Sequence, residues 1–167
     1  VYGGSSSGNV KGNINVTVNG KVLAGSHNAD AVIGDVTDRW LGGTVQGGCM
    51  QGDVKGNVTT TIGPKASVHA VIGGCDDGGV HGSTSVHVYG TILKQRYQNA
   101  NRFLSGAGCV FGAGYLSSPR YIKRSIDVAD VTGTSSVYIY PGSNVQGDVY
   151  GGGLTARASG GTHVVVS

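Results

Sequence analysis

The sequence predicts an all-β fold: a β-solenoid, or β-helix, of about five coils with a short helical or loop insertion near 93–128. Three observations lead to this prediction. The 167 residues include 32 glycines and no glutamate, a glycine-rich opening recurs, and alternating apolar residues follow each opening. Glutamate favours helices whereas β-branched residues favour strands, so the composition is typical of strands and turns. We expect 1–167 to be one module, a fragment of a larger protein, with insertions at 23–43 and 91–130.

The openings begin with valine and continue into two or more glycines. A phosphate-binding loop would require a strand–loop–helix context and usually a following Gly-Lys-Ser/Thr, and neither is present. We therefore expect the glycines to turn the corners of the solenoid, where a positive φ or a close backbone approach excludes a Cβ. The openings are Val1–Gly4, Val45–Gly48, Val71–Gly74, Val110–Gly114 and Val149–Gly153.

A strand pattern follows each opening and aligns on a Val-x-Gly sequence. Apolar residues alternate with polar ones, as in Ile14, Val16 and Val18, which predicts strands with one buried face. A repeat this short cannot bury its own apolar face, so the copies must stack, with about three short strands in each turn. The aligned segments are 8–22, 52–68, 79–92, 130–145 and a fifth at 159–167.

These openings and strands resemble the VYGGG…GxVxGxTxVTIxGG repeats of large extracellular, adhesin-like proteins of gut and rumen Firmicutes. The resemblance does not extend to 23–43 or 91–130. It implies a protein that is secreted or attached to the bacterial cell surface. It is specific for architecture and says little about activity, because solenoids include both enzymes and passive binders.

Charge and hydropathy argue against two partners, nucleic acid and the interior of a membrane. The net charge is +3 and the pI is about 8.8, with six of the twelve Lys and Arg residues between Lys94 and Arg124. A nucleic-acid-binding protein would carry a more continuous basic stripe, so we expect no nucleic-acid partner. The longest apolar run is a few residues, so we expect no insertion into a membrane.

The insertions contain three further candidates. Trp40 either packs on the flank of the solenoid or is exposed to stack on a ligand. Residues 93–104 have the spacing of a helix that covers an edge or flank. Six basic residues either form a patch for an anionic partner or belong to a solvated face: Lys94, Arg96, Arg102, Arg120, Lys123 and Arg124.

Stacking of the aligned strands predicts a flat, polar outer face. On it His87, Tyr89, Tyr138 and Tyr140 should cluster towards one end. Aromatic rings beside amides and hydroxyls suit sugars, whose apolar faces stack and whose hydroxyls form hydrogen bonds. Ordinary cross-strand tyrosine pairing explains the same pattern without a ligand.

Cys49 and Cys75 occupy the same position of the repeat, so they should form either a disulfide or a ladder of buried thiols. No CxxC motif indicates zinc, and the histidines have no metal-like spacing, so we expect no cofactor. A structural calcium ion is left open, although the calcium-binding nonapeptide of β-rolls is absent. The only adjacent carboxylates are Asp76 and Asp77, and neighbours in a turn point apart, unlike a glycosidase pair.

No serine or cysteine nucleophile arrangement can be identified, so we expect a non-catalytic module. The expected function is extracellular binding or adhesion, with a polysaccharide or glycan on the flat face. A structural stalk or self-assembling filament, associating through its ends, is the first alternative. The second is a polysaccharide lyase, with Asp76, Asp77, Arg96 and Tyr97 as candidates.

Overall fold

The computed structural model describes residues 1–23, 43–94, 107–115, 129–154 and 156–167. Across these ranges the chain forms parallel β-sheets and no helix. Most of the expected helix at 93–104 lies outside them, because the described part stops at Lys94. The predicted all-β class is therefore confirmed, and the sheets are stacked in a way that is consistent with a β-helix.

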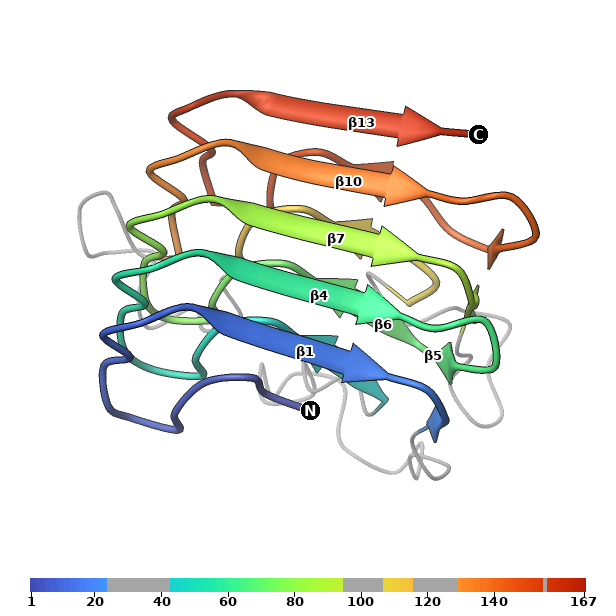
Figure 1. Ribbon diagram of the computed structural model, residues 1–167, viewed down its shortest axis with the longest axis horizontal. Coiled ribbons are helices and arrows are strands. Elements are labelled where there is room, and N and C mark those ends of the chain that lie inside the picture. Colours follow the sequence, from blue (N-terminus) through green and yellow to red (C-terminus); the bar gives the residue numbers. More distant parts are fainter. Residues whose placement is uncertain (24–42, 95–106, 116–128, 155) are drawn as a thin grey trace, which may run out of the picture.

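Five long strands form the largest sheet, in the order β1-β4-β7-β10-β13, and every neighbouring pair is parallel. Figure 1 shows them stacked from the N-terminal to the C-terminal end of the chain. Their bounds are Ile14–Val18 for β1, Val58–Ile62 for β4, Thr84–Val88 for β7, Ser135–Ile139 for β10 and Thr162–Val166 for β13.

Two four-stranded parallel sheets accompany the long one, in the orders β11-β8-β5-β2 and β12-β9-β6-β3. The chain visits the long sheet and then each short sheet in turn, and we call this sequence of three strands a pass. The first short sheet contains β2 (Lys21–Val22), β5 (Ser67–Val68), β8 (Thr91–Ile92) and β11 (Asn144–Val145). The second contains β3 (Thr44–Gln46), β6 (Ala70–Ile72), β9 (Val110–Phe111) and β12 (Val149–Tyr150).

Four of the five long strands bury every second residue, as the alternation predicts, and β13 at the end of the sheet is the exception. In β4, β7 and β10 the first, third and fifth residues are buried and the others are partly exposed. The register places β-branched residues of similar size in one column, with Val16 beside Thr60, then Val86, then Val137. Successive passes therefore share one apolar core, which removes from water the face that a single repeat could not cover.

Most glycines of the openings are required by close approach rather than by a positive φ. The positive-φ glycines among the described residues are Gly43, Gly52, Gly108, Gly142 and Gly161, and none of them belongs to an opening. In the openings, by contrast, a Cβ would collide with a neighbouring part of the chain at every glycine except Gly152. One on Gly73 would meet the carbonyl oxygen of Gly112 and lie 2.9 Å from Val86 Cγ2. Of the two expected causes, close approach is the one observed.

Side-chain oxygens connect one pass to the next at the start of the long strands. Asn13 Oδ1 accepts the backbone N–H of Asn57 at 2.8 Å, and Asn57 Oδ1 accepts that of Ser83 at 2.8 Å. Ser83 Oγ continues the series by accepting the N–H of Thr134 at 3.1 Å. The corner therefore has satisfied backbone donors where the strand ladder has not yet begun.

Replacing Gly73 with alanine should lower the free energy of unfolding by about 1–3 kcal/mol, because the new Cβ meets the backbone of Gly112 and cannot be relieved by a rotamer change. Urea unfolding measures this. Gly12→Ala is the matched control, since a Cβ there has nothing within 4 Å, and it should change stability by less than about 0.5 kcal/mol. Equal effects of the two changes would contradict the close-approach explanation.

Candidate functional site

The aromatic residues predicted for the outer face lie together at one end of the long sheet. His87 on β7 is the register partner of Tyr138 on β10. Tyr89 and Tyr140 follow these strands immediately, and the Tyr140 N–H donates to the Val88 carbonyl at 3.0 Å. The expected cluster of four is thus observed, with two residues, two positions apart, from each of two neighbouring passes.

The rings stack on one another along the direction in which the passes stack. The ring centroids of Tyr89 and Tyr140 are 4.1 Å apart with planes 7° from parallel, and those of His87 and Tyr138 are 4.9 Å apart at 11°. His163 on β13 meets Tyr138 edge-on at 5.9 Å. This geometry is that of cross-strand pairing, so the rings present mainly edges and hydroxyls to solvent.

Tyr89 is the most exposed of the four rings, with 36% of its surface accessible to solvent. The equivalent residue on the preceding pass is Gly63, which follows β4 as Tyr89 follows β7, so that pass supplies no aromatic ring to pair with Tyr89. The row of stacked rings therefore ends at Tyr89 on this side.

A chain of hydrogen bonds runs through the same cluster. Ser85 Oγ lies 2.9 Å from His87 Nε2, and His87 Nδ1 lies 3.0 Å from the Tyr140 hydroxyl. Partial burial lowers the pKa of His87, which favours the neutral imidazole. The pKa of Tyr140 is raised, chiefly because its hydroxyl is hydrogen-bonded to Tyr89.

The Ser–His pair was not identified from the sequence, although a signal was present. Ser85 and His87 are two residues apart in a segment whose alternation had already assigned both to the outer face. Residues two apart on one strand face are neighbours, so the pairing follows from the strand period. The structure thus brings together a serine hydroxyl and an imidazole that the sequence analysis had not paired.

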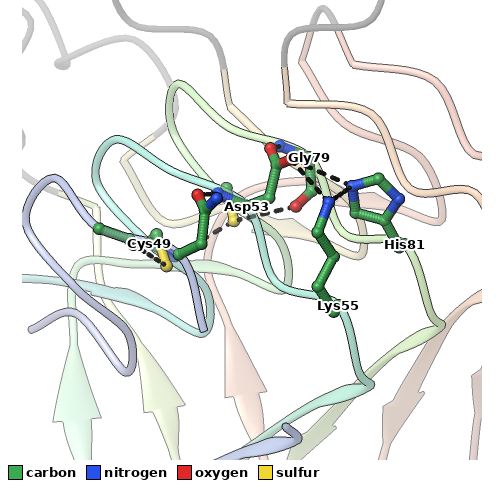
Figure 2. Close-up of polar contacts among 8 residues, drawn as sticks. Cys49, Asp53, Lys55, Gly79 and His81 are labelled. Carbon is green, nitrogen blue, oxygen red and sulfur yellow. Dashed lines mark hydrogen bonds and ion pairs between the residues drawn. The ribbon is translucent and has the colours of Figure 1, made fainter. Parts of the chain in front are cut away.

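A second polar cluster lies at the corner that precedes the long strands (Figure 2). Lys55 Nζ and His81 Nε2 are each 3.1 Å from Asp53 Oδ2 and are 2.8 Å from each other. The other carboxylate oxygen of Asp53 accepts the Gly79 N–H at 3.1 Å. Lys55 and His81 occupy the middle position of the Val-x-Gly sequence in their repeats. Because Val54 pairs with Val80, the register places Lys55 beside His81.

The environment of Asp53 stabilises its charged form. Partial burial alone would raise the pKa of this carboxyl. The hydrogen bonds from His81, the Gly79 N–H and Lys55, together with the charge of Lys55, outweigh that effect and hold the pKa below its ordinary value. All three side chains are more than a third exposed, so the ion pairs themselves contribute little to stability.

Cys49 and Cys75 are free, buried thiols on neighbouring passes, the second of the two expected arrangements. The Cys49 N–H donates to Cys75 Sγ at 3.2 Å. Burial raises the pKa of the Cys75 thiol to about 12, so it stays protonated near neutral pH. A protonated, enclosed thiol is a core side chain rather than a nucleophile or metal ligand.

Of the other residues singled out in the sequence, Asp76, Asp77 and Lys94 lie within the described ranges. Asp76 is buried and Asp77 is partly buried, and the N–H of Lys94 donates to Gln146 Oε1 at 3.0 Å. Over the ranges given above, no group of three or more His, Cys, Asp or Glu side chains could hold a metal ion, and no helix is long and apolar enough to cross a membrane. The other candidates lie outside the described residues: Trp40, Arg96, Tyr97, Arg102, Arg120, Lys123 and Arg124.

No known protein family matches the chain, and neither the curated proteins nor the solved structures contain a match.

Two replacements of Asp53 distinguish the contribution of its hydrogen bond with the Gly79 N–H from the contribution of its ion pairs. Asp53→Asn keeps an acceptor for the Gly79 N–H, as Asn9 Oδ1 is for the Asp53 N–H, and should cost less than about 1 kcal/mol at pH 7. Asp53→Ala also leaves that N–H without its acceptor and should cost about 1–2 kcal/mol. Urea unfolding of the three proteins measures both values.

The pH dependence of the same variants follows from the lowered pKa. A carboxyl whose folded-state pKa is below its unfolded value, near 3.8, contributes stability that is present above that value and lost as the pH falls through the folded-state pKa. The advantage of wild type over Asp53→Asn should therefore shrink below about pH 4. An advantage that grows in acid would contradict this assignment.

Proposed function

We propose that the chain is a β-solenoid of five coils, carrying lateral insertions, that serves as a binding module of an extracellular bacterial protein. Its ligand is a polysaccharide or glycan, held on the outer face of the long sheet at the aromatic cluster of His87, Tyr89, Tyr138 and Tyr140. Secretion or attachment to the cell surface follows from the resemblance to the VYGGG-type repeats.

The observation that carries this proposal is the exposed ring of Tyr89 at the end of a row of tyrosines. Gly63 on the preceding pass supplies no ring that would stack on it, and Tyr138 and Tyr140 belong to the following pass. A sugar ring can stack its apolar face on Tyr89 while its hydroxyls exchange hydrogen bonds with the tyrosine edges. The stacked neighbours hold Tyr89 in place, which reduces the entropy lost on binding.

Binding should be seen as retention on an insoluble matrix. We expect the purified chain to be retained on at least one of cellulose, xylan, pectin or mucin. Tyr89→Ala and the double variant Tyr138→Ala/Tyr140→Ala should each weaken that retention about tenfold, since an aromatic stack contributes on the order of 1 kcal/mol. Depletion of the protein from the supernatant over a range of matrix concentrations gives the affinity.

Tyr150→Ala is the matched control, because Tyr150 is also an exposed tyrosine (44%) but stacks on Phe111 in another sheet. Circular dichroism and the thermal midpoint establish that each variant is folded. Retention that is lost equally in the Tyr150 variant, or that persists in all the tyrosine variants, would move the ligand away from this face. No retention on any matrix would favour the second candidate.

That second candidate is a stalk or filament in which passes stack between molecules. It is favoured by β13, the last strand of the long sheet, whose Val164 and Val166 are 43% and 69% exposed. The same positions on β10, Val137 and Ile139, are 0% and 7% exposed. A parallel strand from a second copy would cover these valines and pair with the free edge of β13.

Sedimentation velocity over a range of protein concentrations tests this association. If it occurs, the average mass should rise with concentration, and Val166→Lys should restore a monomer by placing a charge in the contact. Lys65→Ala, a change at an exposed corner away from β13, is the control and should leave the association unchanged. A monomer at every concentration would rule out stacking of this chain through β13.

A further inference from the structure

The hydrogen bonds at the aromatic cluster have the form of a nucleophile, a base and an orienting group. Ser85 Oγ is 2.9 Å from His87 Nε2, and His87 Nδ1 is 3.0 Å from the Tyr140 hydroxyl. Catalytic serines are recognised by this constellation, a hydroxyl within hydrogen-bonding reach of a base that a third group holds in place, on many unrelated folds. All three side chains are on the outer face, where a substrate can approach from solvent.

The proposed role of Ser85 requires the His87 tautomer that carries its proton on Nδ1. In this tautomer the Nδ1–H donates to the Tyr140 hydroxyl at 3.0 Å, and Nε2 accepts from the Ser85 hydroxyl at 2.9 Å. Ser85 is then hydrogen-bonded to the nitrogen that would receive its proton.

We propose that Ser85 is a nucleophile that hydrolyses carboxylic esters, with His87 as general base and Tyr140 as the residue that positions His87. This activity goes beyond polysaccharide binding and does not depend on it, because the acyl group is the only part of the substrate that the three residues engage. The substrate class is an ester of a small carboxylic acid, reached from the solvent side of the sheet.

The reaction balances with water as the second substrate. Ser85 Oγ attacks the ester carbonyl carbon, and its proton passes to His87 Nε2. The tetrahedral intermediate collapses, the bond to the alcohol oxygen breaks, and His87 returns the proton to the leaving alcohol. Water then attacks the acyl-serine and gives a proton to His87, and the second collapse releases the acid and returns that proton to Ser85.

The environment supports these roles. Partial burial lowers the pKa of His87, so the imidazole is neutral and able to accept a proton near pH 7. The imidazole ring stacks on Tyr138 and Tyr140 of the following pass, which restrains its orientation. On the neighbouring strand β4 the register partner of Ser85 is Thr59, whose hydroxyl is the candidate donor to the developing oxyanion.

Covalent labelling tests the nucleophile directly. The folded chain is incubated with a fluorophosphonate probe, and the modified peptide is identified by mass spectrometry. Hydrolysis of 4-nitrophenyl acetate is followed in parallel. We expect the label on Ser85, and Ser85→Ala should reduce hydrolysis at least about 10²-fold, the lower end of what a positioned base and nucleophile contribute.

Two variants control for surface hydroxyls and for structure. Ser136 is the register partner of Ser85 on β10 and is also partly buried. The residue two positions after Ser136 is Tyr138, where β7 has His87. Ser136→Ala should therefore retain the labelling of Ser85. His87→Phe keeps a ring to stack on Tyr138 and removes the base, so it should lose labelling while remaining folded.

Tyr140→Phe tests positioning separately from structure. This variant keeps the ring stacked on Tyr89 but removes the hydroxyl that accepts from the His87 Nδ1–H. That hydroxyl helps stabilise the protonated imidazole. We expect a lower labelling rate, and a pH profile whose rising limb is moved to lower pH. The titratable groups that contact His87 are Tyr138 and Tyr140. A merely structural role of the Tyr140 hydroxyl would leave the pH profile unchanged.

The proposal is overturned by any of three results. These are a folded wild-type chain that is not labelled, labelling that is as strong on Ser136 as on Ser85, and ester hydrolysis that survives Ser85→Ala, which would assign it to the imidazole alone. Retention of Ser85→Ala on the polysaccharide matrix is measured in the same preparations, so a failure of the esterase proposal and a failure of the binding proposal are told apart.

Discussion

The structure depends on one constraint: each pass must pair with the next in the same register, position by position. In the long sheet, five consecutive positions of one strand face the same five positions of its neighbour at every step from β1 to β13. Parallel strands in such a sheet lie about 4.8 Å apart. A shift of one strand by one residue is disfavoured because it would turn the apolar side of that strand outward. The core, the corners and the outer face are consequences of this register.

The same constraint explains why polar groups meet in rows. A residue type that recurs at one position of the repeat is placed beside its copy, as Asn13 is beside Asn57. Where the residue type changes between copies, different chemical groups are brought together instead: Lys55 meets His81 at the corner, and Thr61 gives way to His87 and then Tyr138 on the long sheet. The sites of this chain are therefore where its repeats diverge.

Much of the fold follows from the sequence because the repeats can be aligned. The alternation of Ile14, Val16 and Val18 identifies the buried face, and the Val-x-Gly sequence sets the register that the structure has. The aromatic cluster follows from that register as well. The hydrogen bonds within it do not, because an alignment gives the position of a side chain but neither its rotamer nor its partner. The Ser85–His87 contact joins residues two positions apart on one strand, and the contacts of Asp53 join the corners of two neighbouring passes. An alignment of the repeats alone shows neither contact.

At the corner that precedes the long strands, the hydrogen bonds from backbone N–H groups to side-chain oxygens between passes have a direction. The acceptor belongs to the earlier pass and the backbone donor to the later: Asn9 to Asp53, Asn13 to Asn57, Asp53 to Gly79, Asp130 to Arg157. Elsewhere the direction is not uniform, since Cys75 Sγ accepts from Cys49 and Gln146 Oε1 accepts from Lys94. At this corner, a pass added at the carboxyl end of the stack therefore finds its side-chain acceptors already in place, whereas a pass added at the amino end has to bring them.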